Sequence, residues 1–193
     1  MKRRLLPILM TLVLVCALPI WAAFVTSGDV TNPLVCTAGA SELNLRGMIE
    51  QANAGATITL NSNTEIAATL QITKNLTLDL NGCVLRMRGT GSVLKVSDRA
   101  TLTITDSRPQ NPHGSYADLP AGGVITGGEG TDVPGIHYVG GAVYLKKGTT
   151  LKLEGGTLTG NSCSSIYIDG ATFVMSGGTI TGETVGVYNN VGT

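Results

Sequence analysis

The sequence predicts an all-β fold in which short parallel strands wind into a coil, a parallel β-helix. Three observations predict this fold. Of the 193 residues, 26 are Gly and 25 are Thr, whereas 13% are charged, and Thr favours strands while Gly favours tight corners. Short apolar triplets return at a regular spacing along the chain. Gly-rich corners separate them.

Composition also excludes several classes of protein. The chain is 42% hydrophobic with a formal net charge of zero, so it can bury a core, and disorder is excluded. Without Lys2, Arg3 and Arg4, the 13 basic residues fall to ten against 13 acidic ones. This mildly acidic composition excludes a protein that binds nucleic acid by electrostatic attraction to its phosphates. The length allows one domain.

The start of the chain predicts a secretory signal peptide. An apolar run over residues 5–21 follows three basic residues and is succeeded by small ones. We expect cleavage after Ala22, or else after Ala23, so that residues 1–22 form the signal peptide. The alternative is an uncut anchor, because 17 apolar residues are near the lower limit for spanning a bilayer. The protein is therefore expected to be secreted or on the cell surface, and membrane-anchored if the segment is uncut.

The cysteines and histidines predict no metal site and no cofactor. Cys36, Cys83 and Cys163 remain after the leader, with no CxxC pair and no spacing to histidine that suits zinc. His113 and His137 are isolated in loop-like stretches. A disulfide between Cys36 and Cys83 is allowed in an exported protein, but we interpret each cysteine as a small buried apolar side chain.

Three short patterns recur in the same order along the chain. The first is a triplet with apolar ends: Leu70–Ile72, Leu94–Val96, Val143–Leu145 and Ile166–Ile168. The second follows about eight residues later: Leu78–Leu80, Leu102–Ile104, Leu151–Leu153 and Phe173–Met175. The third begins at a Gly corner: Gly82–Arg86, Gly122–Thr126, Gly155–Thr159 and Gly177–Thr181. Three strands per period describe one turn of a parallel β-helix.

The period is regular except in one turn. Successive second strands are 24, 49 and 22 residues apart, and the long interval contains insertions at 108–121 and 128–139 that read as loops. An antiparallel sandwich would not explain why the same three-strand unit returns in the same order. We expect about five turns, about 25 Å long at the usual strand spacing.

A helix is predicted ahead of the coil. Ser41 can cap a helix over about Glu42 to Asn53, whose Leu45, Ile49 and Ala52 form an apolar face that can close the first turn. With residues 23–40 as a linker, the β-helix spans 41–193.

The other end of the sequence begins a turn without closing it. Val187–Thr193 matches the start of the turn at Val143–Thr149. We therefore expect the β-helix to be incomplete at its C-terminus, either as the N-terminal piece of a longer array or as a chain completed by a partner.

Two stretches resemble a known group of proteins. The sequence Ile72-Thr-Lys-Asn-Leu-Thr-Leu-Asp-Leu-Asn-Gly82 resembles the opening turn of right-handed parallel β-helix proteins on bacterial surfaces, and Gly177–Gly182 resembles their later repeats. The resemblance implies a right-handed coil with a pectate lyase-like fold, and an adhesin-like protein. That fold hosts lyases, hydrolases, adhesins and inert stalks, so no single activity is implied.

The outward side chains predict no catalytic set. The first strands present Gln71, Lys95, Tyr144, Tyr167 and Tyr188. The second present Asp79, Thr103, Lys152 and Val174, and the third present Arg86, Thr126, Thr159 and Thr181. Neither a calcium cluster nor a pair of catalytic carboxylates forms there. Acids gather instead in the insertions: Asp118, Glu129 and Asp132, with Asp106 and His113 nearby. We interpret them as solvated loop charges.

The tyrosine column predicts a binding surface. Tyr144, Tyr167 and Tyr188 are 23 and 21 residues apart, so they should stack outward on consecutive turns as an exposed platform for sugar rings. The alternative is a stack that only stabilises the sheet. Flanking basic side chains would favour an acidic polymer: Lys95, Lys146 and Lys147.

The sequence thus predicts a non-enzymatic, exported surface segment, adhesin-like or a stalk, that binds an extracellular polysaccharide or a host surface glycan by its outer face. The alternative is a polysaccharide lyase or glycoside hydrolase with a pectate lyase-like fold. That enzyme would need carboxylates of both insertions to converge beside Lys95 or Lys152.

Overall fold

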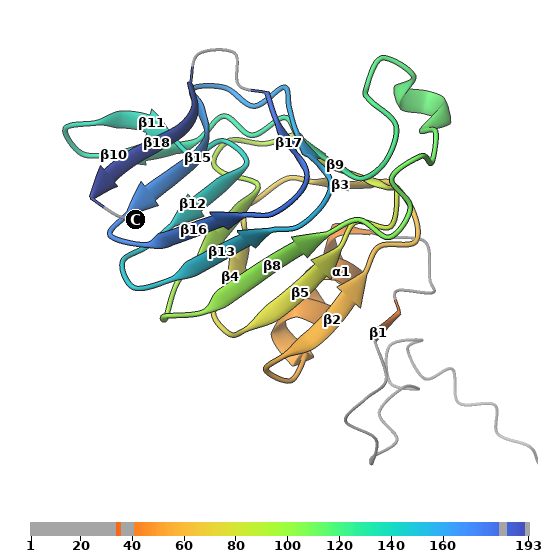
Figure 1. Cartoon of the computed structure of the whole chain (residues 1–193), viewed down its shortest axis with the longest axis horizontal. Coiled ribbons are helices and arrows are strands. Elements are labelled where there is room, and N and C mark those ends of the chain that lie inside the picture. Colours follow the sequence, from red (N-terminus) through yellow and green to blue (C-terminus); the bar gives the residue numbers. More distant parts are fainter. Residues whose placement is uncertain (1–33, 36–40, 182–184, 192–193) are drawn as a thin grey trace, which may run out of the picture. The chain divides into compact units, whose positions relative to one another are not determined.

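A computed structural model describes residues 34–35, 41–181 and 185–191, which form a β-solenoid of three parallel sheets preceded by one short helix (Figure 1). The solenoid belongs to a compact unit that spans 33–193. The predicted signal peptide lies outside the described residues, as does most of the predicted linker.

The chain passes through the three sheets in the same order in every turn. Sheet A consists of β1 (Leu34–Val35), β2 (Ala56–Thr59), β5 (Leu76–Asp79), β8 (Thr101–Thr105), β13 (Thr150–Leu153) and β16 (Thr172–Met175). Sheet B consists of β3 (Thr64–Ile66), β6 (Val84–Met87), β9 (Val124–Thr126), β14 (Thr157–Leu158) and β17 (Thr179–Ile180). Sheet C consists of β4 (Leu70–Ile72), β7 (Leu94–Val96), β12 (Val143–Leu145), β15 (Ser164–Asp169) and β18 (Val185–Val191).

The all-β solenoid with three strands per turn is therefore confirmed, with about six turns when β1 is counted through its place in the six-stranded sheet A. Strand β1 lies inside the segment that the sequence assigned to a linker, and it pairs in parallel with β2. Its two residues extend sheet A by one strand.

Alternating side chains build the core. In β5, Leu76 and Leu78 are buried while Thr77 is half-buried on the outer side, and the inward residues of all three sheets join one apolar cluster with the helix. The corners need unusual backbone angles. At Gly82 φ is +69°, and a side chain there would collide with the Arg108 carbonyl, so this corner requires glycine.

Between β5 and β8 the register of sheet A differs from the predicted one by two residues, whereas β8, β13 and β16 pair as predicted. Leu76, not Leu78, lies beside Leu102, which places Thr103 beside Thr77 and Asp79 beside Thr105. The predicted column of Asp79 and Thr103 is therefore wrong. A shift of two residues keeps every apolar side chain on the same face, so alternation alone cannot detect it.

One buried asparagine joins two corners of the solenoid. Asn161 is fully buried. Its amide oxygen accepts from the Gly128 N–H at 3.0 Å, and its amide nitrogen donates to the carbonyls of Ile125 and Thr159, each at 3.0 Å. All three partners are backbone groups, and the Ile125 carbonyl also accepts from the Thr159 N–H at 3.1 Å. The side chain therefore adds to the backbone hydrogen bonds at this corner.

The predicted helix is present as α1 (Glu42–Gln51), two residues shorter than expected. The Ser41 hydroxyl accepts from the Asn44 N–H at 3.3 Å, which is the predicted cap. The predicted apolar face of Leu45, Ile49 and Ala52 is buried against the first turn of the coil.

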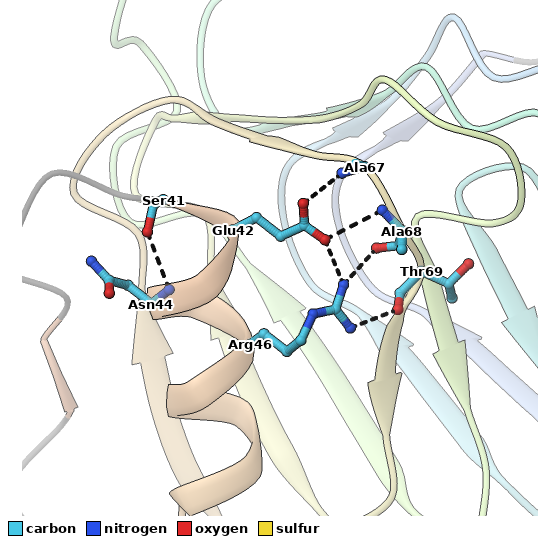
Figure 2. A network of polar contacts seen from close by, with 7 residues as sticks. All are labelled: Ser41, Glu42, Asn44, Arg46, Ala67, Ala68 and Thr69. Atoms are coloured by element: carbon cyan, nitrogen blue, oxygen red, sulfur yellow. Dashed lines mark hydrogen bonds and ion pairs between the residues drawn. The ribbon is translucent and has the colours of Figure 1, made fainter. Parts of the chain in front are cut away.

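Polar contacts fix α1 to the corner between β3 and β4 (Figure 2). The Glu42 carboxylate accepts from the backbone N–H of Ala67 at 2.8 Å and from Arg46 at 2.7 Å. Arg46 also donates to the carbonyls of Ala68 and Thr69. These contacts, led by the bond from Ala67, lower the pKa of Glu42. A charged pair here stays ordered because each partner also bonds the backbone of the coil.

Both predicted insertions are present, and both lie in the turn made of β8, β9 and β12. The first connects β8 to β9 and contains a short 3-10 helix, Gly114–Tyr116. The second is more ordered than predicted, because it forms an antiparallel hairpin of β10 (Thr131–Val133) and β11 (His137–Val139). Figure 1 shows the hairpin and the 3-10 helix at opposite sides of the solenoid.

The last described turn is the least buried part of the solenoid. Its exposed apolar side chains are Val174, Met175, Val185, Tyr188 and Val191. The expectation that the coil is incomplete at this end stays a prediction.

Candidate functional site

The tyrosine column is stacked as predicted. Tyr144 lies beside Lys95 on one side and Tyr167 on the other, and Tyr167 lies beside Tyr188. The ring centroids of Tyr144 and Tyr167 are 5.3 Å apart, and those of Tyr167 and Tyr188 are 5.6 Å apart. These distances are typical of interacting aromatic pairs.

The expectation that this column is an exposed platform is wrong for two of its three rings. Tyr144 is 8% exposed and Tyr167 is 0% exposed, whereas Tyr188 is 40% exposed. The hairpin supplies the cover, because Val139 and the partly buried Val133 pack with the two buried tyrosines in a separate apolar cluster. Binding by the column stays a prediction for Tyr188 alone among the rings.

Burial also changes the chemistry of the two covered rings. It is the main cause that raises the pKa of Tyr144 and of Tyr167, and the Asp169 carboxylate adds to both shifts. The Tyr167 hydroxyl is buried without a well-formed hydrogen bond, although Asn190 lies near enough to counter part of its pKa shift. Burial thus disfavours the ionised form of both phenols, and the two rings act as packing groups.

Where the hairpin stops, the outer face of sheet C forms an open hollow of about 380 Å³. We call it the sheet C hollow. Its lining comes from the outward positions of β4 and β7, from the corners beside them, and from the hairpin: Thr69, Gln71, Thr90, Gly91, Lys95, Gly130, Thr131, Asp132 and Tyr138. The predicted site residue Lys95 thus belongs to this hollow.

The hairpin wall of the hollow is tied to the sheet. Gly91 and Gly130 form an antiparallel bridge. The hydroxyls of Ser92 and Thr131 are 2.8 Å apart, and Ser92 is buried. These contacts keep the two walls at a fixed separation, so the hollow is already formed without a ligand.

Four side chains of the hollow offer different chemistry to a ligand. Tyr138 is 55% exposed and presents an aromatic surface. Gln71 offers an amide that both donates and accepts, Asp132 offers a carboxylate that accepts, and Lys95 offers an ammonium that donates. The Lys95 Nζ lies over the ring of Tyr144, 5.2 Å from its centroid.

A second hollow of about 310 Å³ lies beside α1 and shares Gln71 with the first. Its charged lining residues are Arg46, Glu50 and Lys74. Arg46 is engaged with Glu42 and with backbone carbonyls, and Lys74 donates to the carbonyls of Glu50 and Ala52. These cations hold the helix in place and are less available to a ligand.

The acids predicted in the insertions are not brought together. Asp132 lines the sheet C hollow, whereas Asp118 is exposed on the insertion at the opposite side (Figure 1). Within the described residues no group of three acids, cysteines or histidines is placed to hold a metal ion. Of the acids that the enzyme alternative requires, Asp132 lines the hollow with Lys95, whereas Asp118 and Glu129 are not among its lining residues.

Two of the predicted loop residues have structural roles instead. The Asp106 carboxylate accepts from the N–H groups of Gly82 at 2.7 Å and Gly123 at 2.6 Å. His113 is buried, and its Nε2 lies 2.7 Å from the Pro120 carbonyl, which fixes that nitrogen as the donor. Both side chains shape the first insertion and are not placed for chemistry on a ligand.

A second polar cluster holds the first insertion to sheet B. The Glu65 carboxylate accepts from Arg88 and from the Tyr116 hydroxyl, each at 2.6 Å. Arg86 lies over the Tyr116 ring at 5.7 Å. The bond from Arg88, followed by the bond from Tyr116, lowers the pKa of Glu65 to about 2. Sequence analysis missed this cluster, although Glu65 and Arg86 occupy the same outward column.

The described cysteines are free thiols. Cys83 is buried, as interpreted from the sequence, and desolvation is the main cause that raises the pKa of its thiol. Cys163 is partly buried and free. Cys36 lies outside the described residues, and the allowed Cys36–Cys83 disulfide lies there with it.

Tyr138 is the aromatic member of the hollow, and sequence analysis missed it. Its signal is the Pro134-Gly135 dipeptide, which is typical of a turn.

No helix among the described residues is long and apolar enough to cross a membrane. Comparison of the chain with protein-family models, with curated proteins and with solved structures finds no match.

Proposed function

We propose that this protein is a non-enzymatic segment of an exported, adhesin-like surface protein, and that it binds extracellular glycans in the sheet C hollow. The observation that carries the proposal is the lining of that hollow. An exposed tyrosine, an amide, a carboxylate and an ammonium surround one open space. Sugars bind through hydroxyls that both donate and accept, and through the apolar faces of their rings, which pack on aromatic side chains.

The solenoid supports this proposal through its rigidity. The walls of the hollow are made by adjacent strands of sheet C and by a hairpin that is bonded to them. A rigid site loses little conformational entropy when a ligand binds, so weak polar contacts suffice for useful affinity. Export is supported by the basic and apolar start of the chain.

The test measures which tyrosine contacts the glycan. The purified chain is screened on an array of extracellular polysaccharides and host surface glycans, and the best ligand is titrated by calorimetry. Replacing the exposed ring in Tyr138→Ala should weaken binding about threefold to tenfold, the range of one aromatic contact. The matched control is Tyr188→Ala, which removes another exposed tyrosine of sheet C outside the hollow.

Each result of this comparison is informative. Loss of affinity in Tyr138→Ala with wild-type affinity in Tyr188→Ala supports the hollow. The reverse result would move the site to the tyrosine column. If no glycan binds the wild-type chain, the proposed function is wrong.

The second candidate is a polysaccharide lyase or glycoside hydrolase with a pectate lyase-like fold. The observation that favours it is that Lys95 and Asp132 line the same hollow, so a base and a carboxylate face one space. Incubation with pectin and other acidic polysaccharides should then release unsaturated or reducing ends, and Lys95→Gln should abolish the release. Binding without any release over a long incubation would rule this candidate out.

A further inference from the structure

We propose that Lys95 determines the specificity of the sheet C hollow, and that its ammonium binds the carboxylate of a sugar acid. This inference rests on the proposed function, because it assumes that the hollow takes a glycan. It adds the chemical class of the ligand and gives Tyr144 a role as the positioning residue for Lys95.

Lys95 differs from Arg46 and Lys74, the two cations that line the hollow beside α1. Arg46 is paired with Glu42, and Lys74 donates to two carbonyls at the end of α1. The ion pairs of the described residues are Glu42–Arg46 and Glu65–Arg88, so Lys95 forms none with Asp132 across the hollow. An ammonium has three donors. Those of Lys95 can therefore bind a ligand without breaking an existing ion pair.

Tyr144 fixes the position of the ammonium. The ring of Tyr144 lies under the Lys95 Nζ at 5.2 Å, and the ring itself is held by its stack on Tyr167 and by the hairpin above it. The negative face of an aromatic ring attracts a cation. Lys95 is thereby held over the outer face of sheet C, which reduces the side-chain entropy lost when a ligand binds.

The opposite wall explains why a sugar acid fits better than a simple anion. Asp132 can only accept hydrogen bonds while it is ionised, and Lys95 can only donate them. A sugar acid satisfies both walls, because its hydroxyls donate to the Asp132 carboxylate while its carboxylate accepts from Lys95. A neutral sugar satisfies Asp132 in the same way but leaves Lys95 without a charged partner.

The test uses two probes that differ in a single group. Glucuronate and glucose are titrated into the isotopically labelled chain, and backbone amide shifts at the hollow residues report binding. Glucuronate should bind about fivefold more tightly than glucose, the size expected of one partly exposed charge pair. This preference should decline as salt is raised, because the pair is near solvent.

Four variants isolate the role of each group. Lys95→Gln should bind both sugars equally, whereas the matched control Lys152→Gln, which removes an exposed lysine on sheet A, should keep the preference. Tyr144→Phe keeps the ring and should keep the preference. Tyr144→Leu should lower it, and its folding is checked by circular dichroism.

The outcomes separate this inference from the proposed function. Equal binding of the two sugars by the wild-type chain would overturn the inference while glycan binding stands. A preference for glucuronate that survives in Lys95→Gln would also overturn the inference. This comparison does not depend on whether Tyr144→Leu folds. If neither sugar shifts the amides of the hollow while both are soluble to high concentration, the hollow is not a sugar site and both proposals fail.

Discussion

Replacing the central ring of the tyrosine column tests whether the column is a binding surface or part of the core. The sequence predicts that Tyr167 is exposed, but in the structure it is fully buried between Tyr144 and Tyr188 and beneath the hairpin. Tyr167→Ala therefore removes a buried aromatic side chain and leaves a cavity. Such substitutions cost about 3–5 kcal/mol of unfolding free energy.

The matched variant Tyr167→Phe separates packing from hydrogen bonding. It keeps the ring and both stacking contacts, and it removes a buried hydroxyl that lacks a well-formed hydrogen bond. We therefore expect a change of less than about 1 kcal/mol, because no strong bond is lost. Tyr188→Ala should cost less than Tyr167→Ala, since Tyr188 is 40% exposed and keeps part of its water contact in the folded state.

The measurement is urea denaturation followed by far-ultraviolet circular dichroism at constant pH. In a thermal melt of a domain of this length, the same loss of about 4 kcal/mol lowers the melting temperature by roughly 10 °C. The reasoning would be refuted if Tyr167→Ala were as stable as the wild-type chain. It would also be refuted if Tyr167→Phe were as destabilised as Tyr167→Ala, because the hydroxyl and not the ring would then matter.

Two further predictions concern polar groups. Asn161→Ala should lower the unfolding free energy by about 1–3 kcal/mol, because it removes three hydrogen bonds to the backbone and leaves the buried Gly128 N–H without its partner. The exposed Asn53→Ala should be nearly neutral in the same urea experiment. Because the pKa of Glu65 falls from 4.5 to about 2 on folding, its stabilising effect should be complete above pH 4.5 and vanish as the pH falls through 2; a stability gap between wild type and Glu65→Gln that stays constant from pH 6 to pH 2 would contradict this.

The repeat made the fold predictable. Apolar triplets and Gly corners recur in one order, and each triplet can bury its first and third residues only if it stacks on the next triplet. The helix was equally predictable, because the Ser41 cap and the Leu45, Ile49 and Ala52 face are local patterns. The register between β5 and β8 was not, since a shift of two residues leaves the apolar pattern unchanged.

The candidate site was predictable only in part. Lys95 and the stacking of Tyr144 follow from the period of the coil. Burial of Tyr144 and Tyr167 depends on where the second insertion folds, and an insertion carries no period that reveals its position. The exposure of a column on a regular solenoid can therefore be predicted only once every insertion beside it has been placed.

The hairpin is the element that turns a regular coil into a specific surface. Asp132 lies opposite Tyr138 in its ladder, so these two side chains share one face of the hairpin, and both line the hollow. Val133 and Val139 occupy the alternate positions and pack on the buried tyrosines. Alternation in one short hairpin thus serves two purposes, because one face extends the core over Tyr144 while the other forms a wall beside Lys95. The hairpin both covers the Tyr144 ring that holds the Lys95 ammonium and forms the wall that faces Lys95. The geometry of the hollow and the burial of the tyrosine column must therefore change together.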